Sequence, residues 1–74
     1  MDVIDPHNVT DLFFDGIHEV KIMAGVVRIT LYSRQDDTGV VVARLALPLS
    51  EFPDVIQALA IAQAEAAKSQ PPTN

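Results

Sequence analysis

Residues 17–31 read IHEVKIMAGVVRITL, and this stretch decides the fold. Apolar side chains alternate on both sides of the dipeptide Ala24-Gly25, along residues 17–23 and 26–34. Glycine adopts the positive φ of a tight turn without a steric penalty, so the dipeptide is typical of a β-hairpin. Pairing Met23 with Val26 gathers the apolar side chains on one face, because side chains alternate along a strand. The pairs on this face are Ile22 with Val27, Val20 with Ile29, and His18 with Leu31.

The same apolar face continues onto a third run, residues 40–47 (VVVARLAL). The polar segment Gln35–Gly39 before it has the composition of a five-residue hairpin loop. Pairing Arg34 with Val40 keeps one face apolar across all three strands. The pairs are Leu31 with Ala43, Ile29 with Leu45, and Val27 with Leu47. The run 12–14 is either a short fourth strand or a hydrophobic plug, so we expect an antiparallel meander of three to four strands.

A helix is predicted after Pro48, where the apolar spacing changes from that of a strand to that of a helix. Its apolar stripe consists of Phe52, Val55, Ile56, Leu59, Ala62 and Ala66. An apolar sheet face needs a second layer to cover it. We therefore expect one α+β domain, residues 12–68, in which a C-terminal helix packs on one face of the meander. Residues 1–11 are predicted to be a loosely ordered arm, and residues 69–74 a disordered tail.

The size of the chain predicts self-association. A domain of 74 residues buries only about 60% of its unfolded surface and usually needs a disulfide, a metal or a partner chain. The sequence has no cysteine, so disulfides and thiolate metal sites are excluded. We expect a homo-oligomer, a dimer or higher, with another protein partner as a further possibility. No apolar run reaches membrane-spanning length and the start does not resemble a signal peptide, so we expect a cytoplasmic protein.

The second face of the predicted sheet carries an apolar cluster of Ile17, Tyr32, Val40 and Val42. In the predicted register, Ile17, Tyr32 and Val42 are cross-strand neighbours. Exposed apolar clusters with polar rims usually mark contacts between proteins, although single exposed apolar residues are ordinary. We interpret these four residues as an oligomer or partner interface; the alternative is a scattered, half-exposed surface.

Three of the five basic residues, Lys21, Arg28 and Arg44, fall on this second face. Such a group can hold an anion, a nucleic-acid phosphate or an acidic peptide. The alternative is that Glu19 or acidic groups of a partner neutralise them, since cross-strand charge pairs are common in sheets. The net charge of −5 argues against general nucleic-acid binding.

No residue pattern indicates an enzyme. The sequence contains no phosphate-binding glycine motif and no nucleophile elbow, and its three glycines are explained as turn residues. His18 and His7 have no partners at metal-ligand spacing, so we expect neither a metal site nor a cofactor. The favoured function is a non-enzymatic protein–protein interaction module, an oligomeric adaptor or chaperone-like protein. The alternative is an anion- or nucleic-acid-binding regulator that uses the basic group.

Three segments carry a resemblance to known proteins: Phe14–Ile17, Gly25–Leu31 and Val42–Pro48, followed by the amphipathic helix. With its GVVR strand and the strand end that leads into the helix through proline, residues 12–66 resemble small bacterial domain-of-unknown-function proteins. This resemblance implies a bacterial protein with a meander-plus-helix fold, and it implies no activity. The layout is also similar to that of the SecB export chaperone, whose protomers assemble through strands and helices; this similarity concerns the fold and transfers no function.

Overall fold

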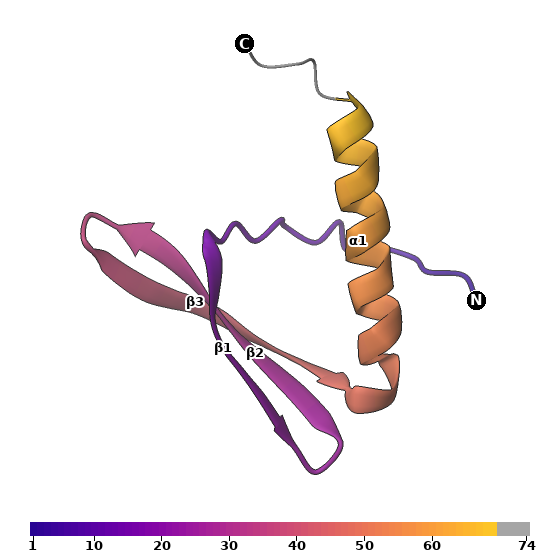
Figure 1. Cartoon of the computed structure of the whole chain (residues 1–74), viewed down its shortest axis with the longest axis horizontal. Coiled ribbons are helices and arrows are strands. Elements are labelled where there is room, and N and C mark those ends of the chain that lie inside the picture. The colour runs from indigo at the N-terminus through magenta and orange to yellow at the C-terminus, as the bar shows by residue number, and fades with distance from the viewer. Residues whose placement is uncertain (70–74) are drawn as a thin grey trace.

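The computed structural model describes residues 1–69, which form a three-stranded antiparallel sheet followed by one helix (Figure 1). The strands β1 (Gly16–Met23), β2 (Val26–Gln35) and β3 (Thr38–Pro48) are hydrogen-bonded in the order β1-β2-β3. One turn of 3-10 helix, η1 (Leu49–Glu51), leads directly into α1 (Phe52–Ser69). The predicted α+β class, the meander and the C-terminal helix are confirmed. Residues 12–14 lie outside the sheet, so it has three strands within the described chain.

Both hairpins turn through only two residues. Ala24 and Gly25 have φ angles of 53° and 75°. Positive φ at both central positions is the pattern of the turn whose twist matches that of the flanking strands. The second turn is Asp36-Asp37, because Gln35 pairs with Thr38. The predicted five-residue loop was therefore wrong: Asp36 takes the left-handed conformation itself (φ 55°), which aspartate tolerates, and the strands run on to the turn.

The predicted register holds along one part of the sheet and shifts by one residue along the other. Every predicted pair of β2 with β3 from Leu31–Ala43 to Val27–Leu47 is present, as are Ile22–Val27 and Val20–Ile29. Beyond Thr30 both outer strands are bulged: β1 between Ile17 and Glu19, opposite the step from Thr30 to Leu31, and β3 opposite the step from Leu31 to Tyr32. Each bulge inserts one unpaired residue and so shifts all later pairs by one.

The two faces of the sheet differ in composition. We call the face that carries Val27 and Leu31 the inner face and the opposite one, with Arg28 and Tyr32, the outer face. Val27 is fully buried and Leu31 is 2% exposed; they are the buried apolar residues of the described chain. The other inner-face residues are also apolar: Val20, Ile22, Ile29, Ala43, Leu45 and Leu47.

The helix does not cover the inner face, so the predicted packing of helix on sheet within one chain was wrong. In Figure 1, α1 leaves the end of β3 and stands apart from the sheet, so that the two form a V. It packs against η1 and not along the strands, and its residues from Pro53 to Lys68 are exposed. The physical reason is the connection. Leu49 follows β3 without a loop, and its N–H donates to the Gly25 carbonyl at 2.8 Å, which fixes the exit direction at the sheet's end.

The N-terminal arm is exposed over residues 1–14 and contains one local turn. In this turn the Asp5 carboxylate accepts a hydrogen bond from the Val9 N–H at 3.0 Å, and the Asp5 carbonyl accepts one from the Asn8 N–H. Ser69 is the last residue of α1, and the rest of the predicted tail lies outside the described residues.

Candidate interaction surfaces

The inner face and the helix present the largest uncovered apolar surfaces that belong to regular elements. On the flanking strands, Ile22 is 57% exposed, and Val20 and Leu45 are each 46% exposed. On α1, Leu59 is 66% exposed. We call the apolar side of α1 the helix stripe; it begins with Phe52, Val55, Ile56 and Leu59. Exposed clusters of apolar side chains often mark contacts with another protein.

On the outer face, the Tyr32 ring lies across two glycines of the neighbouring strands. A Cβ added to Gly16 would lie 2.8–2.9 Å from the ring and its hydroxyl, and one added to Gly39 would lie 3.3 Å from Cδ2. Gly16 is the direct cross-strand partner of Tyr32. The ring therefore occupies the space that side chains at both glycines would fill. Sequence reasoning assigned Gly16 and Gly39 to turns; the missed signal was that glycine within a strand often marks a bulge or a close approach.

The bulges also change the predicted apolar cluster. Tyr32 pairs with Gly16 and Val41, not with Ile17 and Val42 as predicted. Ile17 lies opposite Leu31, a position that the sequence assigned to His18. Directly opposite residues share a face, so these one-residue slips exchange inner and outer positions.

On β3, Val40 lies opposite Ser33 and is therefore not on the outer face with Tyr32, while Val42 lies at the bulge. Val41 takes the place beside Tyr32 that the sequence had assigned to Val42. All four predicted interface residues are at least partly exposed, and their role in an interface stays a prediction.

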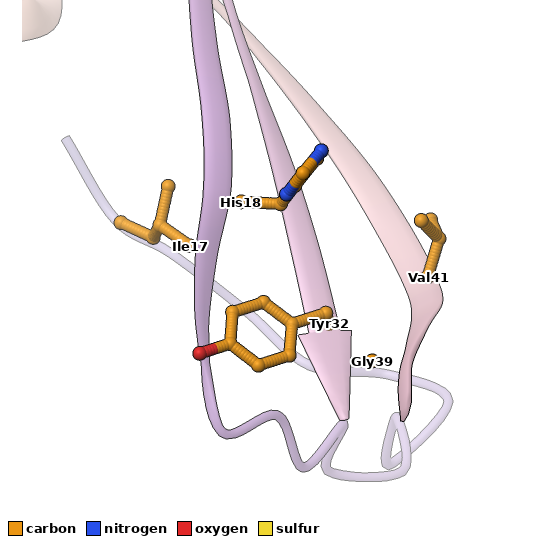
Figure 2. Close-up of a pocket in the computed structure, with 5 residues that line it drawn as sticks. All are labelled: Ile17, His18, Tyr32, Gly39 and Val41. Carbon is orange, nitrogen blue, oxygen red and sulfur yellow. The ribbon is translucent and has the colours of Figure 1, made fainter. Parts of the chain in front are cut away.

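A shallow hollow of about 460 Å³ lies at this end of the sheet. It is lined by Ile17, His18, Tyr32, Gly39 and Val41, so the structure does bring together Ile17 and Tyr32 (Figure 2). Figure 2 shows the Tyr32 ring reaching from β2 toward β1, with Ile17 and His18 leaving β1 in opposite directions. His18 lies at the β1 bulge, where a side chain is not committed to a cross-strand pair.

Asp15 ties the start of β1 to β2. Its N–H donates to the Tyr32 carbonyl at 2.8 Å. Its carboxylate oxygen Oδ2 accepts from the Arg34 N–H at 2.5 Å and from the Ser33 hydroxyl at 3.4 Å. One side chain thus satisfies a backbone donor of β2 just beyond the last β1 pair. This contact fixes the shifted register at the bulged end of the sheet.

The three predicted basic residues lie on the outer face. Lys21 is directly opposite Arg28. Arg44 is opposite Thr30, which is two residues after Arg28 on β2 and on the same face. The Lys21 ammonium lies 3.7 Å from a Glu19 carboxylate oxygen, in an ion pair whose side chains are 65% and 49% exposed. Exposed pairs of this kind contribute little. Like charges directly opposite each other destabilise a sheet, so the Lys21–Arg28 pair is the unusual feature of this group.

Within residues 1–69, no three histidine or carboxylate side chains are placed to share a metal ion. In the same part of the chain, no helix has both the length and the apolar character that crossing a membrane requires.

Comparisons with known proteins add no name to this arrangement. No protein-family model matches the chain, and no curated protein or solved structure is significantly similar to it. The resemblance to small bacterial meander-plus-helix proteins and to the SecB layout therefore stays a prediction.

Proposed function

We propose that this protein is a non-enzymatic protein–protein interaction module, adaptor-like or chaperone-like, that works as a homo-oligomer. The observation that carries the proposal is the amount of surface that the single chain leaves uncovered. The chain exposes 6780 Å². A compact protein of its mass, 8.0 kDa, exposes about 4500 Å².

The excess is about 2300 Å² per chain, and an obligate homodimer buries roughly 1000–2500 Å² on each partner. Part of the excess belongs to the extended arm, whose residues 1–14 are all exposed. The radius of gyration supports the same proposal: it is 15.5 Å, whereas a compact domain of this length has about 11 Å.

The distribution of apolar side chains supports self-association over a stable monomer. The chain is 49% apolar by composition, yet only Val27 and Leu31 are buried among its large apolar residues in the described part. Burial of apolar area supplies the main favourable term in folding, at about 25 cal/mol per Å². Two buried side chains do not offset the conformational entropy of ordering such a chain. Contacts between chains supply the missing burial.

Sedimentation equilibrium of the full chain, from about 1 μM to about 500 μM, tests this proposal. We expect twice the chain mass or a higher even multiple, because closed two-fold assemblies are the commonest. The free energy of unfolding of a dimer should also rise by about 1.4 kcal/mol for each tenfold increase in chain concentration. A monomer at the highest concentration, with an unfolding midpoint that is independent of concentration, would contradict the proposal.

A second candidate function rests on the Lys21–Arg28 pair. An anion bound between these residues and Arg44 would remove the repulsion that the register imposes. The probe is a fluorescein-labelled single-stranded oligonucleotide, followed by anisotropy. With three phosphate contacts, affinity should fall about twentyfold between about 50 and 200 mM salt. Arg28→Gln should weaken binding further, whereas Lys68→Gln at the end of α1 should not; an affinity that does not change with salt or with Arg28 would rule out this function.

A further inference from the structure

The chain carries two uncovered apolar surfaces of matching character. The inner face has apolar residues at its paired positions on all three strands, with no charged side chain among those pairs from Val20 to Leu47. The helix stripe is equally free of charge from Phe52 to Leu59, whereas Asp54 and Gln57 lie on the other side of the helix. Helix on sheet is a standard way of covering such a face.

The connection between β3 and α1 keeps these two surfaces of one chain apart. Pro48 ends β3 in an extended conformation (φ −62°, ψ 139°), and η1 starts at the next residue. The Leu49 N–H is bonded to the Gly25 carbonyl at 2.8 Å, and Pro53 fixes φ in the first turn of α1. Because this bond holds Leu49 at the end of the sheet, folding α1 onto its own sheet would require the chain to change direction within η1 or at the start of α1. In Figure 1, α1 accordingly stands apart from the sheet.

A second copy of the chain fits the uncovered surfaces in both size and chemistry. The 18 residues of α1 span about 27 Å, and the ten residues of β2 span about 33 Å, so a helix can lie along the inner face without a large overhang. Each copy offers one helix stripe and one inner face, so a two-fold pair uses both surfaces of both chains. The excess surface of about 2300 Å² per chain includes the exposed arm, and the area that an obligate interface buries on each partner is of the same order.

We propose that two copies exchange helices, so that the helix stripe of each chain packs on the inner face of its partner. This inference rests on the proposed self-association and specifies how it occurs. It assigns the packing of helix on sheet to neighbouring chains rather than to one chain. It also leaves the outer face, with Tyr32 and the basic residues, free on both sides of the dimer.

The absence of cysteine from the sequence makes a clean crosslinking test possible. Two single-cysteine chains, Leu59→Cys on the helix stripe and Leu45→Cys on the inner face, are mixed, with one of them carrying a mass tag. They are denatured and refolded together, then treated with a short bismaleimide. Leu45 is already 46% exposed, so its replacement disturbs the single chain little. In the matched control, a Gln57→Cys chain is used in place of the Leu59→Cys chain. Gln57 lies on the opposite side of the same helix.

We expect the tagged and untagged chains to crosslink through positions 59 and 45. The yield should exceed that of the Gln57 control by about tenfold or more, because a held pair has an effective concentration near the millimolar range. Ile29→Cys, at the centre of the inner face, provides a second position if the Leu45 variant does not refold. Circular dichroism of each variant confirms that it is folded.

Two outcomes would overturn the helix exchange while leaving self-association intact. One is efficient crosslinking between two Leu45→Cys chains, which indicates sheet-on-sheet packing. The other is an intramolecular crosslink in the Leu59→Cys/Leu45→Cys double variant, which shows that α1 folds onto its own sheet. A failure of the proposed function is distinguishable from both, because the wild-type chain would then sediment as a monomer at all concentrations.

Discussion

Between the Ala24-Gly25 turn and Thr30, the three strands pair residue for residue, and aliphatic side chains line one face. From Thr30 to the Asp36-Asp37 turn, by contrast, both outer strands are bulged and carry a glycine. We call these parts the regular half and the bulged half. The register of the regular half follows from many similar aliphatic pairs, whereas that of the bulged half depends on a few individual contacts. Substitutions in the two halves should therefore differ in both size and kind.

The largest effect is expected from Val27→Asp in the regular half. Val27 is fully buried, so the carboxylate of an aspartate at this position would be buried without a partner. This should cost about 3–5 kcal/mol and abolish cooperative folding in a domain of ordinary stability. Urea unfolding followed by circular dichroism at a fixed chain concentration measures the loss. Val26→Asp, on the same strand and the opposite face, should cost less than about 1 kcal/mol; equal losses would refute the distinction between the faces.

In the bulged half, Tyr32→Ala should cost about 2 kcal/mol, because the half-buried ring covers Gly16 and Gly39. Tyr32→Phe keeps the ring and should change the free energy of unfolding by less than about 1 kcal/mol. The same urea titration compares the two variants. A loss for Tyr32→Phe as large as that for Tyr32→Ala would show that the hydroxyl, and not the ring, holds this half together.

The two turn-proximal glycines separate backbone strain from crowding. Gly25→Ala places a Cβ at φ 75°, which costs about 1–2 kcal/mol although no atom lies within 4 Å of the added carbon. Gly39→Ala meets only the Tyr32 ring at 3.3 Å and should cost less than about 1 kcal/mol. Thermal unfolding at matched concentration ranks the two variants. The reverse order would mean that the ring is held too firmly to give way.

A smaller effect than that of Tyr32→Ala is expected at Asp15. Removing its carboxylate with Asp15→Ala takes away the acceptor of the Arg34 N–H, at a cost of about 1 kcal/mol. Asp15→Asn retains one acceptor oxygen and should lie between this variant and the wild type. Amide hydrogen exchange at Arg34 is the direct readout: it should speed up in Asp15→Ala while exchange at Ile29 stays slow. Unchanged exchange at Arg34 would show that the bond does not fix the shifted register.

The register of the regular half could be predicted from the sequence because several pairs of apolar residues each indicate the same register. The pairs Ile22–Val27 and Ile29–Leu45 each follow from alternation, and any one-residue slip would reverse all of them at once. The bulged half could not, because a bulge is a single insertion that alternation does not encode. Its signals were the positions of Gly16 and Gly39 on either side of Tyr32, which are visible only once the strands are aligned.

The position of the helix relative to the sheet could not be predicted from the sequence, for a different reason. The apolar stripe from Phe52 to Leu59 predicts that α1 packs against an apolar surface, but the pattern is the same whether that surface belongs to the same chain or to another. The direction of α1 is set by two features: no loop follows Pro48, and the Leu49 N–H is bonded to the Gly25 carbonyl. Neither feature produces a periodic pattern in the sequence. The predicted interface residues Ile17, Tyr32, Val40 and Val42 were misaligned by the same bulges that shifted the register.

The two-residue turns have a kinetic consequence. Strands joined by Ala24-Gly25 and by Asp36-Asp37 meet without closing a long loop, and hairpins of this kind form in about 1–10 μs. At a chain concentration of about 1 μM, association with a rate constant of about 10⁵–10⁷ M⁻¹ s⁻¹ takes on the order of 0.1–10 s. If the chain self-associates as proposed, its hairpins form at least about ten thousand times faster than it finds a partner. During that interval its apolar faces would be open to any other unfolded or half-assembled chain, so the rate of synthesis would set the balance between assembly and aggregation.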